Sequence, residues 1–213
     1  MSGEVVVPRR TRVKICGITD QVEAQAIVAM GVDALGFIFV KSSPRYVEPE
    51  RVRAIVASLP PFVDAVGVFL DDDVVVVNEV AGYCGLTMIQ LHGNESPLYC
   101  QSIDRPVVKA FRVREEALPD FSPYRQVVTG FLLDTYRPGQ AGGTGETFNW
   151  ELVRRLSIPG PLILAGGLTP DNVCVAIHQA HPFAVDVNSG VEVSPGRKDL
   201  SAVGRLLVKI AGL

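Results

Sequence analysis

The segment LILAGGLTPDN, residues 162–172, and the segment AVDVNSGVE, residues 184–192, decide how this chain is expected to fold. Each begins as an apolar run without alternation and stops at glycine, as buried parallel strands do. Gly166 and Gly167 allow a tight turn and leave backbone N–H groups open to a ligand. One such turn could be an ordinary connection. Two in neighbouring units, the second at Ser189 and Gly190, predict a shared phosphate pocket.

The same alternation of an apolar run with a helical segment extends back to residue 12. Eight apolar runs, about 25 residues apart, are predicted strands: 13–16, 34–39, 65–69, 88–91, 107–111, 130–133, 162–165 and 184–187. The predicted helical segments are 20–30, 48–58, 72–81, 96–101, 115–118, 150–156, 170–180 and 199–211. Alternating strands and helices with uniformly apolar strands imply a parallel sheet. Eight units favour an α/β fold that closes into a single (β/α)8 TIM barrel.

Local signals give the helix starts and the limits of the domain. Asp20 or Thr19 is expected to cap segment 20–30. Thr169 or Asp171 is expected to cap segment 170–180, with Pro170 in its first turn. Because no break or linker divides residues 12–213, we predict one barrel domain there, and a flexible N-terminal tail over residues 1–11.

The composition excludes several classes of function. The chain has 213 residues, of which 47 % are hydrophobic and 20 % charged, an ordinary soluble profile. Its net charge of −3 argues against nucleic acid or an anionic membrane as partner. The 4 cysteines are widely spaced, which supports neither a disulfide framework nor a metal site. No signal peptide or bilayer-spanning run is present, so a cytoplasmic location is expected.

Two candidate catalytic side chains lie where barrel chemistry is expected, at the carboxyl ends of strands. Cys16 ends the first predicted strand, and its thiol is a usable base near positive charge. Asp134 ends the sixth, where an apolar surrounding suits a general acid. Each has a plainer alternative, since Cys16 could be a small buried hydrophobe and Asp134 a loop cap.

Three further side chains are candidates for binding a ligand. Arg45 follows the second strand and could hold a carboxylate with two parallel hydrogen bonds. Gln90 and His92 lie two residues apart on the fourth strand, so both are expected to point into the barrel. His92 has no partner at ligand spacing, so no metal site is predicted. The glycine-rich loop at residues 142–150 could close over a substrate.

Nine motifs, in order over nearly the whole chain beyond the tail, resemble those of the phosphoribosylanthranilate isomerase family. They are KICGIT (14–19), GFIF (36–39), SPRYV (43–47), VGVF (66–69), QLHG (90–93), LLD (132–134), GGTG (142–145), AGGL (165–168) and DVNSGVE (186–192). One such motif carries little information, whereas nine in register are highly specific.

The resemblance implies an aldose–ketose isomerase of tryptophan biosynthesis that uses no metal and no organic cofactor. Its reaction is the Amadori rearrangement of N-(5-phosphoribosyl)anthranilate to 1-(2-carboxyphenylamino)-1-deoxyribulose 5-phosphate. By position, Asp134 is the general acid, Cys16 the general base, and Arg45 the residue that holds the anthranilate carboxylate. The remaining expected substrate-binding residues are Gln90, His92, Gly166, Gly167, Asp186, Ser189 and Gly190.

Two other functions are compatible with a phosphate-binding barrel. The related isomerase of histidine synthesis is expected to have a carboxylate base on the first strand, where this chain has Cys16. A catalytically silent regulatory barrel is expected to lack one of the acid–base pair. The partner is expected to be a small-molecule substrate, and the chain either a monomer or a homodimer.

Overall fold

Eight parallel strands close into a barrel in a computed structural model, which describes residues 10–113, 119–134, 150, 153 and 156–213. The strands are β1 (Arg12–Cys16), β2 (Ala34–Ile38), β3 (Asp64–Phe69), β4 (Met88–Leu91), β5 (Val107–Arg112), β6 (Gly130–Asp134), β7 (Leu162–Ala165) and β8 (Ala184–Val187). The predicted (β/α)8 barrel is confirmed, and each predicted strand differs from the observed one by at most one residue at an end.

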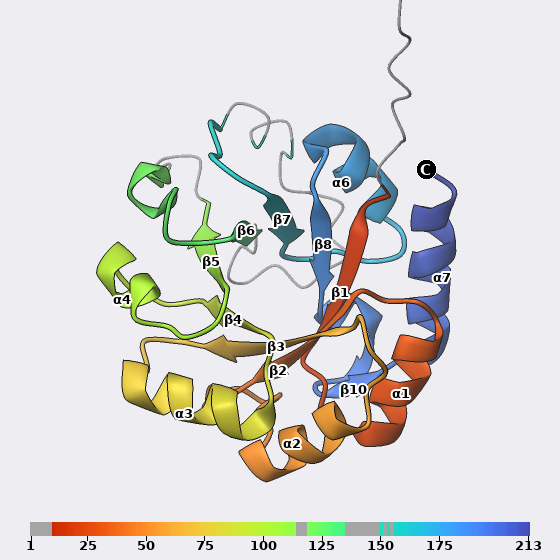
Figure 1. Cartoon of the computed structure of the whole chain (residues 1–213). Helices are drawn as coiled ribbons and strands as arrows, with labels where there is room; N and C mark the ends of the chain where they lie inside the picture. The colour runs from red at the N-terminus through yellow and green to blue at the C-terminus, as the bar shows by residue number, and fades with distance from the viewer. Residues whose placement is uncertain (1–9, 114–118, 135–149, 151–152, 154–155) are drawn as a thin grey trace, which may run out of the picture.

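Six α-helices lie among the described residues, and Figure 1 shows helices placed around the outside of the strands. They are α1 (Gln21–Ala29), α2 (Pro49–Ala57), α3 (Val74–Cys84), α4 (Pro97–Gln101), α6 (Val173–Ala180) and α7 (Leu200–Ala211). Asp20 caps α1 as predicted, because its carboxylate accepts hydrogen bonds from the N–H groups of Val22 and Glu23. Asp73 and Asp199 cap α3 and α7 in the same way.

The predicted start of α6 is wrong. The helix begins at Val173, three residues after Pro170, and neither Thr169 nor Asp171 caps it. Instead the Thr169 hydroxyl accepts from the Asp171 N–H at 3.2 Å, and the Asn172 side chain accepts from the Thr169 N–H at 2.8 Å. These local side-chain bonds satisfy the N–H groups of Thr169 and Asp171, while the N–H groups of Asn172 and Val173 donate to the Thr169 carbonyl, so the segment before Val173 forms a turn and not a regular helix.

Some elements were not predicted, and some predictions fall outside the described residues. A hairpin of β9 (Glu192–Ser194) and β10 (Arg197–Lys198) follows β8, and short 3-10 turns lie at η1 (Ser122–Tyr124) and η2 (Ser189–Val191). Four predicted segments lie wholly or mostly outside the described ranges. They are the helix at 115–118, most of the helix at 150–156, the loop at 142–150 except Trp150, and the tail up to residue 9.

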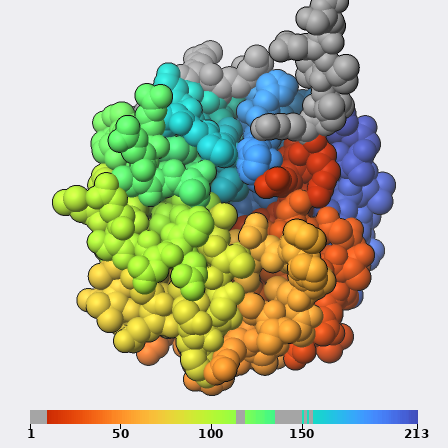
Figure 2. Space-filling model, viewed as in Figure 1, coloured from red at the N-terminus to blue at the C-terminus, as the bar shows by residue number. Residues whose placement is uncertain are grey.

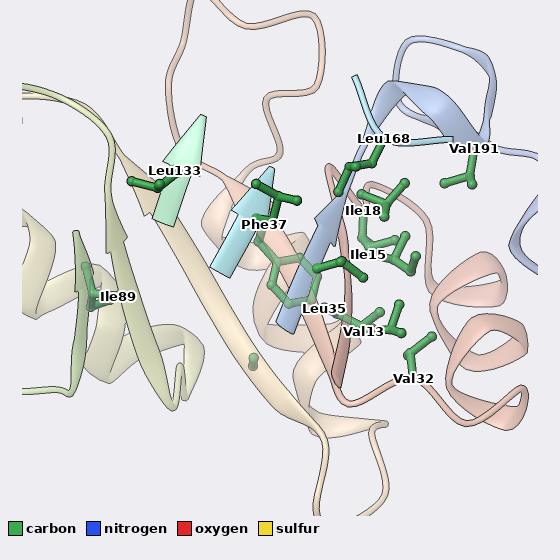
Figure 3. Packing of buried hydrophobic residues seen from close by; sticks show 14 of the residues in the cluster. Val13, Ile15, Ile18, Val32, Leu35, Phe37, Ile89, Leu133, Leu168 and Val191 are labelled. Atoms are coloured by element: carbon green, nitrogen blue, oxygen red, sulfur yellow. The ribbon is translucent and has the colours of Figure 1, made fainter. Parts of the chain in front are cut away.

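Alternation along the strands separates two buried regions. Outward side chains such as Ile15, Leu35, Phe37 and Ile89 are fully buried between the barrel and the helices. Figure 3 shows Val13 and Ile15 of β1 on the side of the strand that faces the helices. This layer supplies the main hydrophobic stabilisation, since each fully buried aliphatic or aromatic side chain contributes about 1.5–3 kcal/mol.

The inner layer is smaller and partly polar. Val108, Ala110, Leu132 and Ala165 form its apolar part. Three buried polar side chains of the barrel strands also belong to this inner layer, namely those of Lys14, Gln90 and Asp186. A polar group at this depth needs a partner or a function, because its burial is otherwise costly.

The barrel closes because β1 pairs in parallel with β8, with Lys14 opposite Asp186 in the register. In Figure 2 the red N-terminal part of the chain accordingly lies beside the blue C-terminal part. No helix within the described ranges has the length and apolar character needed to cross a bilayer.

Candidate active site

A cavity of about 310 Å³ opens at the carboxyl ends of the strands. Nine of the ten predicted site residues line it. Its full lining is Cys16, Arg45, His92, Asp134, Ala165, Gly166, Gly167, Leu168, Asp186, Asn188, Ser189 and Gly190. These residues lie on strands far apart in the sequence or on the loops that follow them, and only the closed barrel brings them together.

Gln90 is the predicted site residue that the structure does not bring to this cavity. It lines a second cavity of about 260 Å³ at the amino ends of the strands, together with Arg12 and Asp64. Gln90 on β4 and His92, directly after its end, do both face the inside of the barrel. Residues two apart are nevertheless separated by about 6.6 Å along a strand, so they belong to different layers of the barrel.

The two glycine turns meet at one wall of the cavity. Gly166 and Gly167 have φ angles of 86° and 65°, which side chains other than glycine rarely adopt. Gly190, in the turn after β8, lies so close to Leu168 that a Cβ would collide with the Leu168 carbonyl oxygen. The N–H groups of both turns are therefore concentrated in one place, which suits an anion such as a phosphate.

Cys16 is 4 % exposed and lies beside a buried ion pair of Lys14 and Asp186. The Lys14 ammonium group donates to Asp186 Oδ2 at 2.7 Å. Burial raises the pKa of the Cys16 thiol above its ordinary value, although the charge of Lys14 acts in the opposite direction. Burial alone would lower the pKa of Lys14, but attraction by Asp186 and Cys16 raises it above the ordinary lysine value.

Arg45 is held by Glu192 at the rim of the cavity. Its Nε and Nη2 donate to the Glu192 carboxylate at 2.6–3.0 Å. Arg45 was predicted to hold a substrate carboxylate with two parallel hydrogen bonds. Its Nε and Nη2 instead make such a pair of bonds with Glu192. Nη1 donates no hydrogen bond within the described part of the chain and is left for a ligand.

Lys198 joins this group from the β10 strand. Its Nζ donates to Glu192 Oε1 at 2.7 Å and to Asn188 Oδ1 at 3.0 Å. Burial lowers the pKa of Lys198. Burial would raise the pKa of Glu192, but hydrogen bonds from Arg45 and Lys198 lower it below the ordinary range. Glu192 is therefore ionised and forms ion pairs with both Arg45 and Lys198.

Asp134 lies on the opposite side of the site, at the end of β6, with 22 % of its side chain exposed. Its Oδ2 is 3.4 Å from Nε2 of His92. The strands β7 and β8 separate Asp134 from Cys16, so the two groups reach the cavity from different sides. An acid and a base placed in this way can act on different atoms of one substrate.

Sequence reasoning missed three charged residues of the site: Lys14, Glu192 and Lys198. Lys14 had a readable signal, because it lies two residues before Cys16 on the same strand and must share its inward side. Glu192 and Lys198 had none, since they approach Arg45 only through the unpredicted hairpin. Among the described residues, no group of three or more His, Cys, Asp or Glu side chains is arranged to hold a metal ion.

Comparison with known proteins identifies the family to which this chain is similar. The sequence profile of the family described as N-(5′phosphoribosyl)anthranilate (PRA) isomerase matches residues 13–209. The curated N-(5′-phosphoribosyl)anthranilate isomerase of Geobacter sp. (strain M21) is 50 % identical over 203 residues, which cover 93 % of this chain and 97 % of that protein.

Solved structures give the same result. Phosphoribosyl anthranilate isomerase from Thermotoga maritima is 42 % identical with a TM-score of 0.86, covering 95 % of this chain and 100 % of that chain. A phosphoribosyl anthranilate isomerase in complex with reduced 1-(o-carboxyphenylamino)-1-deoxyribulose 5-phosphate is 39 % identical with a TM-score of 0.83 and the same coverage.

Proposed function

The chain belongs to the N-(5′-phosphoribosyl)anthranilate isomerase family of tryptophan biosynthesis, and on that premise we propose that Cys16 is its general base and Asp134 its general acid. The observation that carries the proposal is that one cavity collects a buried thiol, a carboxyl group, an arginine and two glycine turns. These are the groups that a substrate with a phosphate, a labile sugar ring and a carboxylate requires.

The substrate's two anionic ends set its orientation in the cavity. The phosphate binds to the N–H groups of the turns at Gly166–Gly167 and Ser189–Gly190. The anthranilate carboxylate binds to Arg45 through Nη1, while Glu192 holds the rest of the guanidinium group in place. Asp186 Oδ1 is buried and has no hydrogen-bond partner in the described ranges, so it accepts a hydrogen bond from a sugar hydroxyl.

The reaction then proceeds by a series of proton transfers, of which Asp134 and Cys16 carry out the first two. Asp134 protonates the furanose ring oxygen, and the ring bond from C1 to that oxygen breaks to give a Schiff base. The Cys16 thiolate removes the proton from C2, and the electron pair of that bond forms an enolamine. Tautomerisation to the C2 ketone removes the proton of the C2 hydroxyl and places one on C1. Exchange with solvent returns a proton to Asp134 and removes the one on Cys16, so both groups are restored and the rearrangement needs no external oxidant or reductant.

The buried environment of Cys16 suits a thiol that ionises only in order to act as a base. Burial raises the pKa of the thiol, so its ionisation is less favourable than that of an exposed cysteine. The thiolate that does form is a correspondingly stronger base, as the Brønsted relation requires. The C–H group at C2 of the Schiff base is a weak acid. Its deprotonation therefore gains more from a strong base than from a weaker base that is fully ionised at rest.

The test is turnover of freshly made phosphoribosylanthranilate, followed by the loss of its fluorescence. Cys16→Ala and Asp134→Asn should each lower kcat by roughly 10²–10⁴-fold, since each removes a proton-transfer group. Cys174→Ala and Asp171→Asn, which change the same residue types on and before α6, should keep near-normal turnover.

Two outcomes would contradict the proposal. Near-normal turnover by Cys16→Ala or Asp134→Asn would remove that residue from the assigned role. Binding of the reduced product analogue by the unmodified protein without any turnover would leave only a phosphate-binding barrel. Circular dichroism and denaturant unfolding of each variant would show whether a loss of rate is a loss of fold.

A further inference from the structure

Lys14 lies in the interior of the barrel, where an unpaired ammonium group would be strongly disfavoured. Its side chain is 9 % exposed, and that of its partner Asp186 is 6 % exposed. Buried ion pairs are often no more stabilising than apolar side chains of similar volume. A pair of this kind directly beneath a reactive thiol therefore points to a role other than stability.

The Lys14 ammonium group lies close to the Cys16 thiol. Both side chains point inward from β1, two residues apart. Cys16 Sγ lies 2.7 Å, and Lys14 Nζ 2.9 Å, from the position that a Cβ would take at Gly36. Gly36 is the partner of Cys16 in the register of β2, so its missing side chain leaves the space in which thiol and amine meet.

The charges around Cys16 favour a thiolate once it forms. Three cations and two carboxylates form the group on this side of the cavity: Lys14, Arg45, Lys198, Asp186 and Glu192. With Cys16 as a thiol the group has one excess positive charge, and a thiolate removes that excess. Lys14 attracts the thiolate most strongly, whereas Asp186 repels it. His92 and Asp134 line the other side of the same cavity.

We propose that Lys14 is a positioning residue for the general base: its ammonium group, held in place by Asp186, stabilises the Cys16 thiolate that removes the C2 proton. The inference rests on the proposed role of Cys16. Lys14 does not line the substrate cavity, so it acts through Cys16 and not on the substrate. After proton transfer the thiol is neutral again, and Lys14 keeps its charge throughout.

Ultraviolet absorbance of the thiolate tests this without reference to turnover. Subtracting the titration of a Cys16→Ala counterpart removes the signal of every other cysteine and of the tyrosines. In Lys14→Met the thiolate fraction of Cys16 at a given pH should fall roughly tenfold or more, because an adjacent positive charge is lost. In Asp186→Asn it should rise, because a negative charge is lost and Lys14 is freed to face the thiolate.

Lys109→Met is the matched control. Lys109 is also a buried lysine in an ion pair, 3.1 Å from Glu95, with side chains 3 % and 1 % exposed. It lies on β5 and does not line the cavity, so its loss should cost comparable stability and leave the Cys16 titration unchanged. The double variant Lys14→Met/Asp186→Asn leaves neither charge unpaired. If Lys14→Met fails to fold, this variant should still show a smaller thiolate fraction than the unmodified protein.

Opposite shifts in Lys14→Met and Asp186→Asn would support the inference. Superimposable titrations of Lys14→Met and the unmodified protein, or equal shifts in Lys14→Met and Lys109→Met, would overturn it. The limb of the kcat/KM profile that belongs to the thiol should move with the titration in Lys14→Met. Full turnover by Cys16→Ala would contradict the role of Cys16 itself, and the titration separates that failure from a failure of the Lys14 inference.

Discussion

Gly190 illustrates how a single missing side chain shapes one wall of the cavity. Its backbone touches the Leu168 carbonyl group, which belongs to the loop after the preceding strand. Thr169 Cγ2 would also lie 3.1 Å from a Cβ at this position. The close approach brings the turn after β8 against the turn after β7, so the N–H groups of both face the same part of the cavity.

We predict that Gly190→Ala weakens substrate binding more than it weakens chemistry. The added methyl group meets rigid backbone, so the turn must shift, at a cost of about 1–3 kcal/mol. KM for phosphoribosylanthranilate should rise about tenfold or more, as expected when phosphate contacts lengthen. Steady-state kinetics and urea unfolding measure both effects. Gly212→Ala, where a Cβ has only ordinary contacts at 3.7 Å, is the control. An unchanged KM in Gly190→Ala would contradict the turn's assigned role.

The helices show how the conformation of a glycine decides the effect of replacing it. Gly82 lies within α3, and no atom outside the helix backbone lies within 4 Å of the position that a Cβ would take there. Gly85 ends the same helix with φ of 69° and ψ of 34°. The first is ordinary helical backbone, in which glycine is less favourable than alanine. The second is a left-handed cap, in which glycine is the favoured residue.

Two substitutions three residues apart in and after α3 should therefore have opposite effects on stability. Gly82→Ala should raise the free energy of unfolding by about 0.5–1 kcal/mol. Gly85→Ala should lower it by about 1 kcal/mol, because alanine must adopt the left-handed conformation. Urea denaturation at neutral pH measures both. Both lie outside the site, so kcat and KM should not change. Destabilisation by Gly82→Ala would show that α3 does not retain its helical geometry there.

The whole molecule contains buried thiols whose protonation is coupled to folding. Cys84 in α3 and Cys100 in α4 are both 2 % exposed. Burial raises the pKa of each to about 11. The unfolded chain releases these protons at lower pH than the folded protein does. The contribution of each protonated thiol to the free energy of unfolding is fully present below the ordinary thiol pKa. It is lost as the pH rises towards 11.

We predict a steep alkaline loss of stability. Between about pH 8.5 and pH 11, each of the two thiols should lower the free energy of unfolding by on the order of 1–3 kcal/mol. Urea unfolding at a series of pH values measures the slope. The double variant Cys84→Ala/Cys100→Ala should be less stable at neutral pH, because it loses buried sulfur, but its stability should fall less with pH. Parallel curves for the two proteins would contradict the linkage.

The candidate site is also a property of the whole molecule. Lys14 and Asp186 are 172 residues apart in the chain, and Arg45 and Glu192 are 147 apart. Pairing of β8 with β1 brings both pairs together when the barrel closes. Substitutions that break the pairing of β1 with β8 should therefore displace the proposed base Cys16, the two glycine turns and Arg45 together.

The sequence by itself determined the eight strands and the residues near their carboxyl ends, because apolar runs and glycine turns are local signals. Cys16, Asp134 and the two glycine turns could be found in this way. Tertiary structure alone decided that Gln90 faces the opposite end of the barrel from His92, and that Glu192 already holds Arg45. It also decided that Lys14 meets both Asp186 and the Cys16 thiol. The physical reason is that alternation gives only the side of a strand, whereas depth within the barrel and charge pairing depend on register between strands distant in the chain.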